Sequence, residues 1–219
     1  MGLMTLADFR GELSAVTGGR ANIGDPRIDL WINFGYFDVT GAVEFDELED
    51  ELEVTTTSSV DSVNLPSTVR SVYGVRGPSG LLQWVTKHEW MRLFGAASAE
   101  PTKWTRIGNE IKLSPTPNAL YSLIAFTKVD ADKLEADTDV TVLPRTWDMA
   151  VHYLAVSHAY YAMEEVATGA NWLNRAIAYI QTRASEENRQ LIEPGLGGTL
   201  APSLERLAGP MAPANAYGG

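Results

Sequence analysis

The chain has 219 residues, 45% of them hydrophobic and 21% charged, a composition typical of a globular protein with one sizeable core or two small ones. Its 28 acidic and 17 basic residues give a net charge of −11, and an acidic surface repels the phosphate backbone of nucleic acids. Sequence-specific nucleic-acid binding is therefore disfavoured, whereas a surface past which DNA slides without adhering remains compatible. The absence of cysteine excludes disulfides, thiolate nucleophiles and cysteine-ligated metals.

Targeting and membrane segments are not expected. The N-terminal sequence lacks a basic region followed by an apolar stretch, so it does not read as a secretory signal. No apolar run approaches the roughly 20 residues that a membrane-spanning helix needs. We therefore expect synthesis in a cytosol without a membrane step.

Two helices are expected in the first 50 residues. Thr5 is a suitable N-cap for a helix that runs to Thr17, and two glycines follow it. Asp25 followed by Pro26 predicts the N-cap and first turn of a second, strongly apolar helix that reaches about Val43.

Seven acids occur in the ten residues Glu44–Glu53. They indicate either a cation site or acidic docking patch, or a solvated helix end that leads into a strand. Charge runs are usually solvated, and no glycine occupies the turn position of a calcium loop. We favour the solvated interpretation here, and also for the acidic loop from Asp130 to Asp139.

The middle of the chain has the pattern of a β module. Strands are expected from Leu52, over Thr68–Arg76, and over residues 81–86, where apolar and polar residues alternate. A short helix follows over Lys87–Phe94, with Thr86 and Glu89 in the spacing of a capping box. A hairpin around Gly108-Asn109 and a last strand, 120–128, complete the module.

The central element of the predicted fold is a helix from Thr146 to Ala167, with Thr146 as its N-cap and Gly169 beyond its end. It is apolar on nearly all sides, which is typical of a buried helix. A second, amphipathic helix is expected over Asn171–Leu191.

Residues 193–219 have an unusual composition, because 15 of these 27 residues are glycine, proline or alanine. Such a segment cannot bury enough apolar surface to order itself, so we expect an arm that docks on a partner. Leu204 and Leu207 are its expected anchors.

No catalytic or metal-binding motif is recognisable, and no cofactor is expected. His152 and His158 are six residues apart on one predicted helix, which places them on different faces, and a core or interface role is favoured. Phosphate-binding loops, dinucleotide fingerprints and nucleophile elbows are absent from the sequence. Among the six tryptophans, Trp84, Trp90 and Trp104 are weak candidates for carbohydrate stacking.

Several sequence stretches together resemble the head-to-tail adaptor, or connector, proteins of tailed bacteriophages. These are the helix DPRIDLWINFGYFDV, the strand region NLPSTVRSVYGVR, the hairpin and strand IGNEIKLSPTPNALYSLIAFTK, and the helix LPRTWDMAVHYLAVSHAYYAMEE. The resemblance covers roughly residues 25–191. It consists of structural residues and carries no catalytic site.

The resemblance implies a structural virion protein in the neck, made in the host cytoplasm, that forms a ring of twelve copies beneath the portal protein. Its partners would be the portal, neighbouring copies and a downstream tail or nozzle protein, with DNA passing through the lumen. Two alternatives stay open. One is another ring-forming neck, head-completion or tail-terminator protein, and the other is a cytosolic acidic hydrolase or carbohydrate-binding module.

The expected fold is α+β. A helical bundle of two N-terminal and two C-terminal helices (residues 1–50 and 129–192) carries an inserted antiparallel β module (51–128) and an extended C-terminal arm (193–219). Portal or neighbour contacts are expected at five residues of the arm: Leu196, Leu200, Leu204, Leu207 and Met211. Ring or tail contacts are expected at four residues of the β module: Tyr73, Trp84, Trp90 and Trp104.

Overall fold

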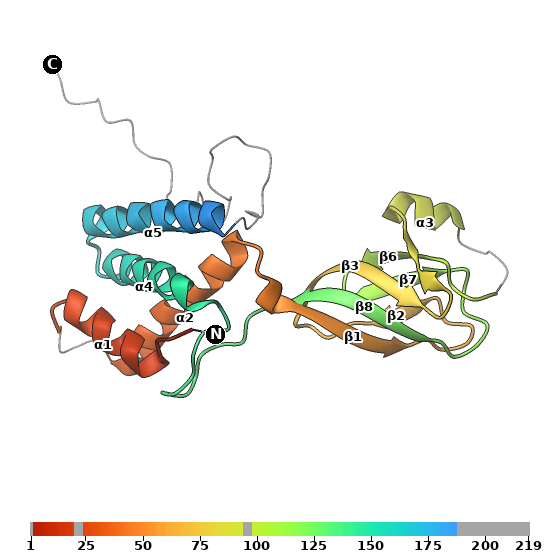
Figure 1. Ribbon diagram of the computed structural model, residues 1–219, viewed down its shortest axis with the longest axis horizontal. Coiled ribbons are helices and arrows are strands. Elements are labelled where there is room, and N and C mark those ends of the chain that lie inside the picture. Colours follow the sequence, from red (N-terminus) through yellow and green to blue (C-terminus); the bar gives the residue numbers. More distant parts are fainter. Residues whose placement is uncertain (1, 20–23, 94–97, 188–219) are drawn as a thin grey trace, which may run out of the picture. The chain divides into compact units, whose positions relative to one another are not determined.

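The computed structural model describes residues 2–19, 24–93 and 98–187, which form two compact units (Figure 1). Leu48–Asp130 form a β unit with one short helix, and the residues before and after it form a helical unit. The predicted α+β fold, with β structure inserted between two N-terminal and two C-terminal helices, is confirmed. The predicted C-terminal arm lies outside the described residues. Among the described helices, none combines the length and the hydrophobicity of a membrane-spanning segment.

The helical unit begins much as its sequence predicts. Its elements are α1 (Leu6–Val16), α2 (Asp25–Ala42), the 3-10 turns η1 (Asp46–Leu48) and η2 (Arg145–Trp147), α4 (Asp148–Ala162) and α5 (Val166–Glu186). The Thr5 hydroxyl accepts a hydrogen bond from the Asp8 amide, and the Asp8 carboxylate accepts one from the Thr5 amide, so α1 has a complete capping box. At α2 the N-cap is Gly24 rather than Asp25.

The two C-terminal helices have other boundaries than predicted. Thr146 does not cap the central helix, because it lies in η2 and its hydroxyl donates to Glu187 Oε1 at 2.8 Å. That helix, α4, ends at Ala162, and Glu164 follows with φ +64°. Gly169 lies inside α5, where an added Cβ would come within 3.1 Å of the Tyr161 ring. This glycine therefore serves close packing between α4 and α5 rather than helix termination.

The helix α4 is the centre of this unit and packs against α1, α2 and α5 (Figure 1). Leu154 in its middle has no exposed surface. The crossing with α2 is close, because a Cβ added at Gly35 would lie 2.7 Å from the carbonyl oxygen of Val151 and 2.8 Å from the amide nitrogen of Ala155. The predicted buried central helix is confirmed in position, although it is shorter than expected.

Buried polar groups fasten two segments to the helices: the N-terminal residues and the segment that returns from the β unit to α4. The Asn33 side chain accepts from the amide of Leu134 at 2.8 Å and donates to its carbonyl at 3.1 Å. The Asp148 carboxylate accepts hydrogen bonds from the amides of Leu3 and Met4. Since buried polar groups are costly unless they are paired, these bonds fix one path for the chain.

Two four-stranded sheets make up the β unit. Its elements are β1 (Glu49–Thr55), β2 (Ser62–Asn64), β3 (Val69–Gly77), β4 (Gly80–Leu81), β5 (Gln83–Trp84), α3 (Lys87–Leu93), β6 (Lys103–Ile107), β7 (Glu110–Ser114) and β8 (Ser122–Val129). The strand orders are β1-β8-β3-β4 and β2-β7-β6-β5, and every pairing is antiparallel except that of β5 with β6.

The strand predicted over residues 81–86 is divided between the two sheets. β4 pairs with β3 in the first sheet, and β5 pairs with β6 in the second. Leu82 lies at the crossover, where its amide donates to the Val75 carbonyl at 2.8 Å and its side chain is buried. The strand β2, three residues long, was not predicted.

A shared hydrophobic core joins the two sheets into a sandwich. Val75 and Leu123 enter it from the first sheet, and Trp104 and Ile111 enter it from the second. The guanidinium group of Arg106 on β6 also donates to the carbonyls of Val69 and Arg70, at 2.8 and 2.6 Å, and so bridges the sheets at one end.

Candidate assembly surfaces

Negative charge is concentrated in one of the two units. Leu48–Asp130 contain nine acidic and eight basic residues, whereas the rest of the chain contains nineteen acidic and nine basic residues. The sequence of the helical unit and its C-terminal extension therefore carries −10 of the net charge of −11. An electrostatic effect on a passing polyanion would come almost entirely from this part of the chain.

An exposed apolar stripe runs along α2. Leu30, Phe34 and Phe37 are 46%, 44% and 38% exposed, although the helix also buries Ile28, Trp31 and Tyr36 in the core. The spacing i, i+4, i+7 places the three exposed side chains on one helical face.

Phe34 also contacts the His158 ring edge-on, with 5.7 Å between the ring centroids. Nε2 of His158 lies 2.7 Å from an Asp38 carboxylate oxygen.

The sequence of α2 predicts a strongly apolar helix but does not separate its buried face from this stripe, because large apolar residues occur at nearly all angles around the helix. A signal was available in the spacing of Leu30, Phe34 and Phe37, because residues at i, i+4 and i+7 share one face of a helix.

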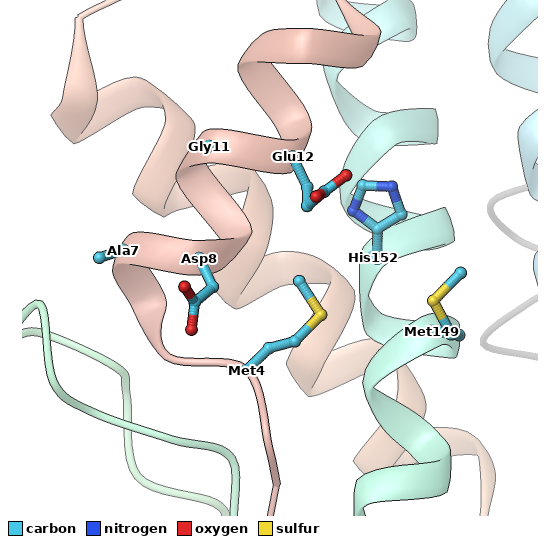
Figure 2. A pocket seen from close by; sticks show the side chains of 7 residues that line it. All are labelled: Met4, Ala7, Asp8, Gly11, Glu12, Met149 and His152. Atoms are coloured by element: carbon cyan, nitrogen blue, oxygen red, sulfur yellow. The ribbon is translucent and has the colours of Figure 1, made fainter.

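A groove of about 640 Å³ lies between α1 and α4 (Figure 2). Its lining residues are Met4, Ala7, Asp8, Gly11, Glu12, Met149 and His152. Gly11 opens its wall, because a Cβ added there would meet no atom within 4 Å. Figure 2 shows the side chains of Glu12 and His152 directed toward one another across the space between the two helices.

His152 is the unusual member of this groove. His152 is only 6% exposed, and its Nδ1 atom has no hydrogen-bond partner among the described residues. Burial lowers the pKa of His152, and the nearby Glu12 carboxylate opposes that shift. The neutral imidazole therefore predominates at pH 7, with its ring edge-on to Trp172 of α5 at 6.5 Å. The interface role expected for this histidine stays a prediction.

The lowered pKa of His152 predicts acid sensitivity. Below the unfolded-state value near 6.5, the unfolded chain binds a proton at His152 while the folded chain resists it. Stability should therefore fall as the pH drops from about 6.5 toward the folded-state pKa. In His152→Phe, urea unfolding at a series of pH values should show a smaller loss over this range. An unchanged pH dependence would contradict the assignment.

A basic and aromatic face of α5 adjoins α4. The guanidinium of Arg175 lies over the Trp172 ring at 4.7 Å, and that of Arg183 lies over the Tyr179 ring at 5.3 Å. Arg183 also pairs with Glu186 at 2.7 Å. Arg175 is exposed and has no carboxylate partner in the described part of the chain.

The residues of the β unit proposed for ring or tail contacts differ in exposure. Tyr73 is 54% exposed and Trp84 is 58% exposed, whereas Trp90 on α3 is half-buried. Trp104 is only 2% exposed and belongs to the sandwich core. The expectation of a contact at Trp104 is therefore corrected, because strand β6 directs this side chain between the sheets.

The acidic clusters have ordinary local roles where the structure describes them. Glu49 begins β1 and lies 3.5 Å from Lys128, and Asp137 pairs with Arg10. The Asp139 carboxylate accepts hydrogen bonds from two backbone amides, which lowers its pKa. Within residues 2–19, 24–93 and 98–187, no three histidine or acidic side chains are placed to hold a metal ion.

The five residues proposed for the arm, Leu196, Leu200, Leu204, Leu207 and Met211, lie outside the described residues. Their role stays a prediction from sequence.

Comparison with known protein families identifies the family of this chain. Residues 4–196 match the family model described as SU10 adaptor protein, a span that includes every described helix and strand. A search of the curated proteins found no match. The matched span is wider than residues 25–191, over which the sequence resembles phage head-to-tail adaptors. The chain belongs to the SU10 adaptor protein family.

Proposed function

We propose that copies of this chain form a dodecameric ring beneath the portal protein, in the neck of a phage virion, and join the DNA-filled head to the tail. Family membership supports an adaptor, a structural role without catalysis. The main support for a ring of subunits is the exposed apolar stripe of Leu30, Phe34 and Phe37. Three large apolar side chains on one helix face mark a surface that assembly covers.

The charge distribution supports a second part of the proposal, that the helical unit faces the DNA channel. The acidic excess of ten lies outside the nearly neutral β unit. A wall with a net negative charge disfavours adhesion of the phosphate backbone, because its carboxylates repel the phosphates more than its basic side chains attract them. DNA then passes without sequence-specific contacts.

With the helical unit assigned to the channel, the β unit and residues 193–219 remain for contacts with other proteins. The β unit, which we propose folds as a separate domain, supplies ring or tail contacts through Tyr73, Trp84 and Trp90. Residues 193–219 dock on the portal or on a neighbouring subunit. Most of this arm lies beyond residue 196, where the family match ends. Downstream, a tail or nozzle protein binds the ring.

Attachment to purified, tailless capsids that contain the portal tests the proposal. The wild-type chain should cosediment with these capsids and form a ring visible by electron microscopy. Leu30→Ser combined with Phe37→Ser should fold normally, since both side chains are exposed, yet lose ring formation. Truncation before Glu193 should leave the melting temperature unchanged and abolish attachment.

The matched control is Val166→Ser, which removes an apolar side chain that is 61% exposed on α5 and outside the stripe. It should attach and form rings like the wild type. Rings formed by the stripe variant would contradict the role of α2, and normal attachment of the truncated chain would contradict the role of the arm. A wild-type chain that does not bind portal-bearing capsids would overturn the proposed function.

A further inference from the structure

The α1–α4 groove contains a polar atom without a partner. The Nδ1 atom of the buried His152, one of the lining residues, makes no hydrogen bond in the described residues, although buried polar groups are nearly always paired. Glu12 on the opposite wall is exposed and makes no hydrogen bond or salt bridge within the described ranges. Asp8 is already engaged in the capping box with Thr5. One acceptor and one carboxylate are therefore available to the same occupant.

These two groups define the chemistry of that occupant. With its proton on Nε2, the neutral imidazole accepts a hydrogen bond at Nδ1, and a carboxylate prefers a cationic donor. An arginine side chain meets both needs, because its guanidinium group presents several N–H donors in one plane. Its aliphatic part would lie against Met4 and Met149, whose side chains also line the groove.

The chain itself contains a suitable arginine on an exposed helix face. Arg175 lies in the middle of the 21-residue helix α5, has no carboxylate partner in the described part of the chain, and is held by stacking on Trp172. Ala178 and Thr182, one and two turns further along α5, are also exposed, so short side chains lie beside Arg175 along the helix. Short side chains let a second helix approach closely, as Gly11 does on α1.

The other arginines of the described helical unit fit less well. Arg10 and Arg183 already contact carboxylates. Arg27 lies in the first turn of α2, and Arg145 lies in the short turn η2, so neither is in the middle of a long exposed helix face.

We propose that Arg175 of one copy inserts into the α1–α4 groove of a neighbouring copy and binds Glu12 and Nδ1 of His152. Arg175 does not line the groove of its own chain, so the partner is a second copy. Because the two surfaces differ, the contact is head-to-tail, and repetition of a head-to-tail contact closes into a ring when the rotation permits. This inference rests on the proposed ring and identifies one of its subunit contacts.

Cross-linking between single-cysteine variants tests this contact, because the chain has no cysteine of its own. Gly11→Cys and Ala178→Cys are made in copies of different length, mixed, assembled on portal-bearing capsids and treated with a short bifunctional maleimide. With one cysteine in each copy, every link joins two copies. The mixture should give the mixed-length product, and each variant alone should not.

Val166→Cys replaces Ala178→Cys as the control, since it lies on the same helix about 18 Å from Ala178 at 1.5 Å per residue. It should give no link to Gly11→Cys. In the linking background, Glu12→Arg or Arg175→Glu should each lower the yield about ten- to a hundredfold, the equivalent of a lost charged hydrogen bond. The two reversals combined in one chain should restore part of it, since they rebuild the ion pair but leave Nδ1 of His152 without its donor.

The outcomes separate this inference from the proposed function. Rings that form without a link between Gly11→Cys and Ala178→Cys overturn the contact and leave the ring intact. Rings whose link survives both single reversals overturn the pairing of Arg175 with Glu12. If the unmodified chain forms no ring on portal-bearing capsids, the proposed function fails and this contact fails with it.

Discussion

Leu154→Ala should lower the free energy of unfolding by about 2–5 kcal/mol, the usual cost of removing a large side chain from a packed core. Leu154 has no exposed surface and lies in α4, which contacts α1, α2 and α5. The cavity would therefore be lined by several helices, which leaves little room for collapse. Such a loss is a large part of the roughly 5–15 kcal/mol that stabilises a typical domain.

Urea unfolding followed by circular dichroism at 222 nm, where the helical unit dominates, measures this change. Met149→Ala is the matched control on the same helix, because Met149 is 39% exposed and its truncation leaves a smaller cavity. We expect the control to lose clearly less stability than Leu154→Ala. A loss below about half a kilocalorie for Leu154→Ala would contradict the central position of α4.

Gly35→Ala should destabilise the chain by about 1–3 kcal/mol, the typical cost of overpacking, although alanine favours helices. The added Cβ would lie 2.7 Å from a backbone oxygen of α4 and 2.8 Å from a backbone nitrogen. Backbone atoms cannot turn aside as a flexible side chain can, so α2 and α4 must separate. The steric cost therefore exceeds the gain of up to about 1 kcal/mol in helix propensity.

Gly41→Ala in the same helix isolates the propensity effect. A Cβ added at Gly41 meets no atom within 4 Å, so this variant should be as stable as the wild type or slightly more stable. Thermal unfolding of both variants gives the comparison. Equal stability changes at positions 35 and 41 would show that the close crossing of α2 and α4 is absent.

Elements with local signals could be predicted from the sequence. The capping box at Thr5 begins α1, and Pro26 lies in the first turn of α2. Gly108, with φ +64°, forms the turn between β6 and β7, as its position next to Asn109 indicated. In each case the signal acts within a few residues, where the backbone conformation depends little on the rest of the fold.

Elements that depend on distant contacts could not be predicted in this way. From sequence, Gly169 indicates a helix end. It lies inside α5 instead, at a position where any side chain would meet the Tyr161 ring. The strand over residues 81–86 divides because β4 and β5 pair with strands of different sheets. Each strand pairs with partners that are remote in sequence, so the residue pattern of one strand does not predict its partner.

The candidate surfaces were predicted less well than the fold. Sequence spacing separated His152 from His158, but the unpaired Nδ1 atom depends on what surrounds His152 in three dimensions. Trp84 and Trp104 both lie on short strands that pair with one another, yet Trp104 is 2% exposed and Trp84 is 58% exposed. Side-chain type indicates which residues can bind a partner, whereas only the fold shows which of them remain accessible.

The first and last long strands of the β unit are direct neighbours, since Glu49 of β1 lies opposite Lys128 of β8. The chain therefore enters and leaves this unit side by side, at a separation of about 5 Å between paired Cα atoms. Any segment whose ends meet at that spacing can replace Leu48–Asp130 without stretching the helical chain on either side. This connection makes the length of the inserted unit independent of the packing of the helices, since only the spacing of its two ends is fixed.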